Sequence, residues 1–124
     1  MKLIETINFI PFYEKIKDQK MSALTAYRVS KIYKAVKDDA MFYQEKLQQI
    51  LNLYGEVDEN GKLVAAEDGT GIKLKPDKQN ECIEAINELQ DLESNAVFEL
   101  LPMDVLSELQ LTPSEIEEIM GFIA

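Results

Sequence analysis

The longest pattern in the chain is a helical repeat of apolar residues within residues 22–54, a stretch that contains no glycine or proline. The steps of three and four are close to the heptad spacing of a coiled-coil seam. The seam consists of Val29, Ile32, Val36, Ala40, Tyr43, Leu47, Ile50 and Tyr54. Ser22 is a favoured N-cap residue and Gly55 a favoured C-terminal stop. Such a helix would extend over about 50 Å and would need packing partners along its length.

Shorter helical patterns lie on both sides of this seam. Within residues 1–20, the helical spacing of Phe9, Phe12, Tyr13 and Ile16 predicts a short helix that ends near Asp18. Residues 78–93 also carry apolar side chains at helical spacing, after Asp77, a candidate cap. Residues 102–109 predict a short helix opened by a proline. Thr112, Pro113 and Glu115 have the spacing of an N-cap, a first helical residue and the glutamate of a capping box, so they predict the start of a helix.

The pattern changes character in residues 56–76. An Asn-Gly pair at residues 60–61 and the sequence Asp-Gly-Thr-Gly at residues 68–71 indicate two turns, and residues 72–75 alternate with period two. We therefore expect a small β-hairpin that joins the long helix to an antiparallel second helix. The predicted fold is a single, mainly α domain over residues 1–124, with short capping helices at both ends.

Charge is distributed unevenly along this acidic chain, which has a net charge of −10. Residues 1–55 carry nine basic and six acidic side chains, whereas residues 77–124 carry one basic and twelve acidic. A nucleic-acid binder needs a basic surface, so the balance disfavours that class of partner. No apolar run approaches the roughly 20 residues of a membrane span. A single cysteine fits a reducing cytoplasm.

The residues that carry enzyme chemistry are scarce. The chain has no histidine, so neither an imidazole base nor a histidine metal ligand is available. Cys82 lies on an apolar helix stripe and reads as a core residue. The Gly-Thr-Gly sequence at 69–71 lacks the remainder of a phosphate loop, and a calcium loop counted from Asp58 would need its glutamate at Gly69. We expect no enzyme activity, no metal site and no cofactor.

Three groups of residues are instead candidates for binding. The predicted interface of the long helix consists of Tyr27, Val29, Ile32, Val36, Tyr43 and Leu47. The predicted acidic face of the second helix consists of Glu81, Glu84, Glu88 and Asp91. The candidate anion contacts are Arg28, Lys31 and Lys34, whose spacing of three places them along one side of the long helix.

Several segments resemble a small family of tailed-phage and prophage proteins that is classed as a domain of unknown function. The similar segments are residues 19–31, 54–62 (Y-G-E-V-D-E-N-G-K), 71–75, 88–93 and 101–116. They cover most of the chain, but their motifs are caps, turns and seams. Met21-Ser22 replaces the family's usual Leu-Pro. The resemblance implies a phage or prophage origin and carries over no catalytic residue.

These observations predict a non-enzymatic, self-associating interaction protein that serves virion assembly or acts as a structural accessory. Two alternatives remain open. The acidic face could inhibit a host defence or nucleic-acid-handling protein, or the basic residues could hold a small anionic ligand. The expected partners are further copies of the chain and a phage or host protein, with no membrane. The expected location is the host cytoplasm or the virion.

Overall fold

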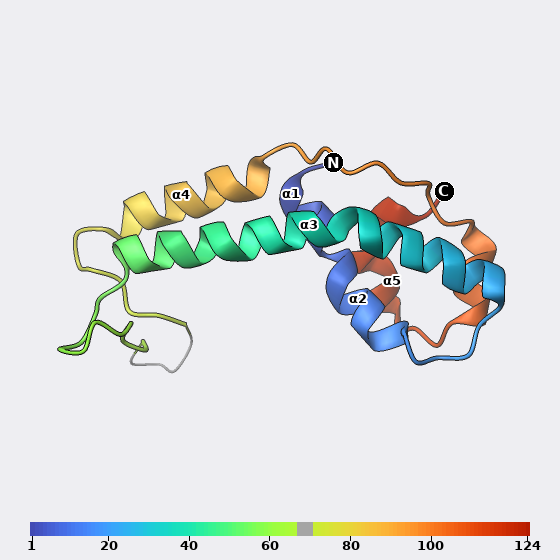
Figure 1. Cartoon of the computed structure of the whole chain (residues 1–124), viewed down its shortest axis with the longest axis horizontal. Helices are drawn as coiled ribbons and strands as arrows, with labels where there is room; N and C mark the ends of the chain where they lie inside the picture. The colour runs from blue at the N-terminus through green and yellow to red at the C-terminus, as the bar shows by residue number, and fades with distance from the viewer. Residues whose placement is uncertain (67–70) are drawn as a thin grey trace. The chain divides into compact units, whose positions relative to one another are not determined.

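The protein is mainly α-helical, as the sequence predicts. The computed structural model describes residues 1–66 and 71–124 (Figure 1). Its α-helices are α1 (Leu3–Ile7), α2 (Phe9–Ile16), α3 (Ala23–Tyr54), α4 (Gln79–Asp91) and α5 (Pro113–Glu118), and its 3₁₀ helices are η1 (Met103–Glu108) and η2 (Met120–Phe122).

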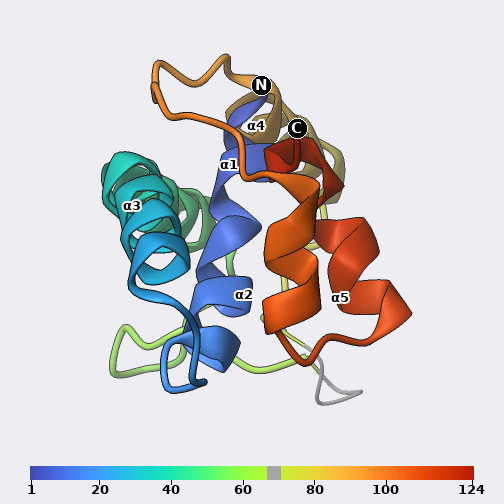
Figure 2. The same ribbon diagram turned by 90° about the vertical axis from the view of Figure 1, so that its right-hand side faces the viewer.

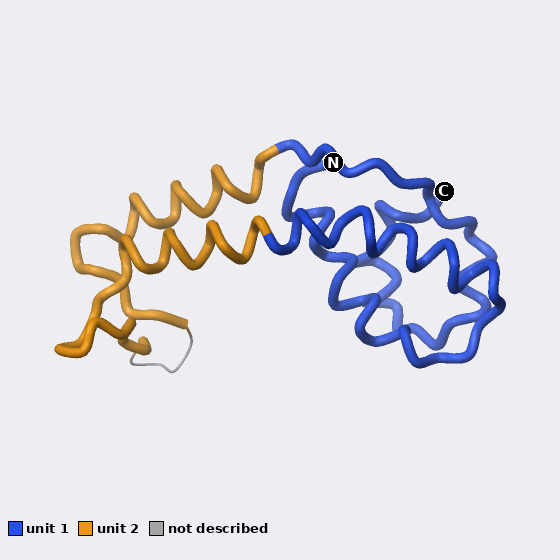
Figure 3. The backbone as a smooth tube through the Cα atoms, in the orientation of Figure 1, with its two compact units in different colours: residues 1–41, 93–124 blue, residues 42–92 orange. Residues whose placement is uncertain are grey.

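Two compact units divide the chain (Figure 3). Unit 1 combines residues 1–41 with residues 93–124, and unit 2 comprises residues 42–92. Helix α3 contributes its first part to unit 1 and its last part to unit 2. The single domain expected over residues 1–124 therefore consists of two units, and unit 2 lies between the two halves of unit 1 in the sequence.

The core of unit 1 is built from α2, the first part of α3 and the C-terminal segments. Figure 2 shows α2 between α3 on one side and η1 and α5 on the other. The core residues are Phe9, Phe12, Ile16, Val29, Ile32, Val36, Leu101, Val105, Leu109, Ile119, Phe122 and Ile123. The end of the chain is docked through a parallel bridge, in which the Leu101 N–H donates to Phe122 and the Ala124 N–H donates to Leu101, both at 2.7 Å.

The start of α3 confirms the predicted cap. The Thr25 N–H donates to Ser22 Oγ at 3.2 Å, and α3 begins one residue after Ser22. A second group at this helix end comes from η1. The Ser22 N–H donates to Glu108 Oε1 at 2.8 Å, and the Thr25 hydroxyl donates to Glu108 Oε2. These bonds, the one from Thr25 foremost, lower the pKa of Glu108 below its ordinary value.

Unit 2 is a helical hairpin with an irregular connection. Helix α4 runs beside the last turns of α3 in the opposite direction (Figure 1). The two helices are joined by a hydrogen bond of 3.3 Å from the Gln90 amide to the Tyr43 hydroxyl. Helix α4 has Lys78 at its N-cap position with no side-chain capping bond, so the predicted cap at Asp77 is wrong.

The predicted β-hairpin is not shown. In the described part of residues 55–75, isolated antiparallel bridges join Gly55 to Leu74, Val57 to Leu63 and Ala65 to Ile72, without forming strands. The Asn-Gly turn is present, since Gly61 has a φ of 78° and the Asn60 and Lys62 N–H groups donate to Asp58 Oδ1. Of the second predicted turn, residues 68–70, including the Gly-Thr of the weak phosphate-loop match, lie outside the described residues, and Gly71 has a φ of 79°.

Candidate functional site

Unit 2 has an apolar groove between α3 and α4. The groove has a volume of about 410 Å³. Its lining residues are Phe42, Lys46, Gln49, Ile50 and Leu53 from α3, and Ala85, Glu88, Leu89 and Leu92 from the α4 side. Phe42 is 41% exposed, Leu53 62% and Leu92 46%. These large side chains border the space between the two helices without closing it.

Two opposite charges border this groove. The Lys46 ammonium lies 5.7 Å from the centre of the Phe42 ring and 3.4 Å from Gln49 Oε1. Glu88 is exposed on α4. Within the described chain, neither Lys46 nor Glu88 forms an ion pair. The groove therefore combines an apolar floor with one basic and one acidic border residue.

The structure corrects most of the predicted interface on α3. Val29, Ile32 and Val36 are at most 2% exposed, because α2 and the C-terminal segments cover them within unit 1. Tyr43 is buried as well, and Leu47 is half-buried. The prediction that these buried residues face another molecule is wrong. Tyr27 is 61% exposed and stays a candidate interface residue.

Ile50 of the predicted seam and Glu88 of the predicted acidic face line the groove, whereas Phe42 and Leu53 lie outside both predicted sets. In a helix that packs on its own chain, seam residues such as Tyr43 become core, and the rows beside the seam remain available to a partner. Phe42 and Leu53 lie in such a row. The signal that could have found them is the width of the apolar stripe, which includes residues outside the strict repeat.

The predicted acidic face is exposed along α4. Glu81, Glu84, Glu88 and Asp91 all lie at the surface. Glu81 pairs with Lys78, whose ammonium is 3.4 Å from Glu81 Oε2. Glu88 also lines the groove of unit 2. The exposure of this face is compatible with a basic partner, which stays a prediction.

The three candidate anion contacts do not form one site. Arg28 and Lys31 line a hollow of about 300 Å³ in unit 1, together with Val97, Phe98, Glu99 and Leu100. Lys34 is not among the lining residues of this hollow. The Lys31 ammonium lies 5.2 Å from the centre of the Tyr27 ring.

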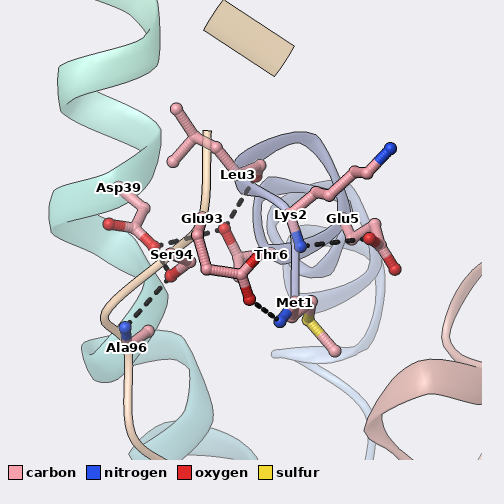
Figure 4. Close-up of polar contacts among 9 residues, drawn as sticks. All are labelled: Met1, Lys2, Leu3, Glu5, Thr6, Asp39, Glu93, Ser94 and Ala96. Atoms are coloured by element: carbon pink, nitrogen blue, oxygen red, sulfur yellow. Dashed lines mark hydrogen bonds and ion pairs between the residues drawn. The ribbon is translucent and has the colours of Figure 1, made fainter. Parts of the chain in front are cut away.

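A polar cluster ties three separate segments of unit 1 together (Figure 4). The buried Thr6 hydroxyl lies 2.7 Å from the Leu3 carbonyl and 3.2 Å from Asp39 Oδ2. The Ser94 hydroxyl donates to the same Asp39 oxygen, and Ser94 Oγ accepts a bond of 3.0 Å from the Ala96 N–H. These polar groups satisfy one another, so the cluster reads as a structural link.

The amino group of Met1 extends this link. It pairs with Glu93 Oε1 at 2.7 Å, and the Ser94 N–H donates to the Met1 carbonyl at 3.0 Å. The hydrogen bond to Glu93 raises the pKa of the Met1 amine above its ordinary value. Both contacts fix the backbone where it enters the second half of unit 1.

Few side chains offer covalent or metal chemistry. Cys82 is buried on α4, and this burial raises the pKa of its thiol. Because the thiolate is the reactive form, a raised pKa makes Cys82 a poor nucleophile. Among residues 1–66 and 71–124, no group of three or more histidine, cysteine, aspartate or glutamate side chains could hold a metal ion. Within the same ranges, no helix is long and apolar enough to cross a membrane.

Comparisons with known proteins found no relative of this chain. No family model matches the chain, and no curated protein or solved structure is similar to it. The resemblance to the phage family stays an expectation from the sequence. The candidate sites therefore rest on their own geometry.

Proposed function

We propose that this chain is a non-enzymatic interaction protein that self-associates through the groove of unit 2. The observation that carries the proposal is the apolar groove between α3 and α4, with Phe42, Leu53 and Leu92 open to solvent. Covering such side chains contributes about 25 cal/mol for each Å² of apolar surface removed from water. A partner that presents apolar side chains of similar shape would therefore bind here.

The charges beside the groove favour a second copy as that partner. A two-fold axis over the groove would place α3 of one copy against α4 of the other. Lys46 would then approach Glu88 of the second copy, and the symmetry-related pair would form on the other side of the axis. The same surface is thus complementary to itself, and two helical hairpins would make a four-helix arrangement.

Sedimentation equilibrium tests this assignment with a matched pair of variants. Leu53→Glu places a carboxylate in the groove, and Ile83→Glu places one on α4 at a residue that does not line the groove. Leu53 and Ile83 are 62% and 53% exposed, so both variants should fold. We expect Leu53→Glu to be monomeric and Ile83→Glu to associate like the unmodified chain. Equal association of the two variants would contradict the proposal.

A charge exchange tests the two-fold arrangement. Lys46→Glu and Glu88→Lys should each weaken association, because each variant would bring like charges together. The double variant should recover it, since the pair is restored with its signs reversed. If the double variant associates more weakly than either single one, Lys46 and Glu88 do not face each other.

A role in virion assembly, or as a structural accessory of a phage, belongs to the same proposal and is supported by the sequence resemblance. Purification of a tagged chain from infected cells, with Leu53→Glu as the control, tests it. Capture of phage structural proteins by the unmodified chain, and their loss with the variant, is the expected result. Capture of one host protein that is lost at high salt would favour the inhibitor role of the acidic face.

A further inference from the structure

The hollow in unit 1 has the composition of a small-ligand site. Three of its lining residues, Val97, Phe98 and Leu100, are apolar, and Arg28 and Lys31 supply positive charge on the α3 side. Its volume of about 300 Å³ is at the lower end of the range for small-molecule pockets. Such pockets have mostly apolar walls and a few charged groups that fix one end of the ligand.

The cations of the hollow form no ion pair with the described residues. Neither Arg28 nor Lys31 forms an ion pair within residues 1–66 and 71–124, whereas Lys17 pairs with Glu14 at 2.8 Å. The half-buried Arg28 guanidinium is a fork of N–H donors that suits a carboxylate. Glu99 lies in the same lining, so the charges add up to +1. This charge suits a ligand with a single negative charge.

The apolar wall is exposed but firmly placed. Val97 is 90% exposed and Leu100 is 47% exposed. Between them, the half-buried Phe98 stacks on Phe122 of the core with ring centres 5.4 Å apart. Phe98 thus anchors to unit 1 a segment that has neither helix nor strand. A bound apolar group would shield side chains that the protein itself leaves in water.

We propose that this hollow binds a small amphiphilic anion, a carboxylate on an aliphatic or aromatic tail. Arg28 and Lys31 hold the carboxylate, and the tail lies against Val97 and Leu100. The size of the hollow favours a free small molecule over a membrane surface or a folded partner. The proposed site lies in unit 1 and is independent of the self-association assigned to unit 2.

Sodium octanoate is a suitable probe because it combines one carboxylate with a short aliphatic tail. Titration followed by amide chemical shifts should give a saturable response at residues 97–100. Acetate lacks the tail and 1-octanol lacks the charge, so each should bind at least about tenfold more weakly. For 1-octanol that factor corresponds to the loss of one hydrogen bond to a charged group, and for acetate to the loss of about two buried CH₂ groups.

Variants assign the binding to individual residues. Arg28→Gln with Lys31→Gln should weaken octanoate binding at least about tenfold. Lys34→Gln removes the neighbouring cation outside the hollow and should leave binding unchanged. Glu99→Gln removes the opposing charge and should tighten binding. The single variant Lys31→Gln, at an exposed position, tests the same point if the double variant does not fold.

Several results would overturn the proposal. A response that does not saturate, equal binding of octanoate and 1-octanol, or equal losses from Lys31→Gln and Lys34→Gln would each exclude an anion-specific hollow. Sedimentation with vesicles that contain an anionic lipid, in the absence of any octanoate response, would point to a membrane surface instead. Because the two sites are independent, Leu53→Glu should bind octanoate as tightly as the unmodified chain, even though it does not self-associate.

Discussion

At the scale of single residues, the Glu108 carboxylate caps the N-terminus of α3, although it lies 86 positions after Ser22 in the sequence. Glu108 accepts hydrogen bonds from the Ser22 N–H and from the Thr25 hydroxyl. The N-terminal N–H groups of a helix have no partner within the helix, and a negative charge is favourable near them. Glu108 therefore joins η1 to α3 as well as capping it.

This contact makes the stability of unit 1 depend on pH. A carboxyl group whose pKa is lower in the folded state stabilises the fold above its ordinary pKa, and this contribution is lost as pH falls through the folded pKa. Hydrogen bonds from Thr25 and Ser22 give Glu108 such a lowered pKa. Glu108→Gln should lower the urea midpoint at pH 7, and the difference from the unmodified chain should shrink below pH 4.5, the ordinary value.

Glu118→Gln is the matched control for this variant. Glu118 is exposed and accepts no hydrogen bond within the described part of the chain. Its replacement should leave the midpoint nearly unchanged at both pH values. A constant difference between Glu108→Gln and the unmodified chain from pH 7 to pH 3 would show that the charge of Glu108 is not what stabilises α3.

The sequence predicted that Ser22 caps α3, but it could not predict that Glu108 also does so. Ser22 was found because its preference for the N-cap is local. Glu108 was missed because it reaches α3 only through the tertiary fold. The same holds for Asp39, which accepts hydrogen bonds from Thr6 and Ser94. Such pairings depend on the packed arrangement of segments, which a local pattern does not contain.

At the scale of elements, the end of α3 depends on the small size of Gly55. Its N–H donates to the Leu51 carbonyl at 2.7 Å, and its φ is not positive, so the left-handed stop implied by the sequence does not occur. A Cβ at this position would lie 2.4 Å from the Leu51 carbonyl oxygen and 2.6 Å from Leu63 Cδ2. Glycine is needed here because the connection packs against the helix end.

Gly55→Ala should therefore destabilise unit 2 by about 1–3 kcal/mol, the usual cost of overpacking. Gly121→Ala is the control, because its nearest atom would be Met1 Cε at 3.3 Å, the flexible end of a side chain. Urea unfolding followed by circular dichroism compares the two. Equal stability of both variants would mean that the chain after α3 shifts at little cost.

Helices were predictable as elements and the hairpin was not. Periods of three and four residues extend over many turns in α3 and α4, so their signal is strong. The β signal came from short runs, in which a turn and a few alternating residues do not fix a register. Isolated bridges between residues 55–57, 63–65 and 72–74 are the outcome. Near the N-terminus the apolar spacing matches α2, and the sequence did not predict that a separate helix, α1, ends at Asn8.

At the scale of the whole molecule, the two units differ in how much they bury. In the described part of unit 2, three apolar side chains are buried, namely Tyr43, Cys82 and Leu89. The core cluster of unit 1 contains twelve. Local opening costs least where few apolar contacts are lost. Unit 2 should therefore open at a lower free energy than unit 1.

Hydrogen exchange and thiol labelling measure this difference. Amides of α4 should exchange faster than those of α2, and labelling of the buried Cys82 thiol should follow the exchange of α4. If the groove binds a second copy, higher protein concentration should protect α4 and Cys82 and leave α2 unchanged, because association stabilises the state that binds. Equal protection of α2 and α4 at low concentration would contradict a weaker unit 2.

Unit 1 is built from two segments separated in the sequence by unit 2, and this affects its folding during synthesis on the ribosome. When residue 92 has been translated, all of unit 2 exists, but α2 and α3 still lack Leu101, Val105 and Phe122, which complete their core. Until then Phe9, Phe12 and Val36 must remain exposed to other nascent chains or to chaperones. A chain released before residues 93–124 are translated would expose a large apolar surface. Uninterrupted translation of these residues therefore protects the chain from aggregation.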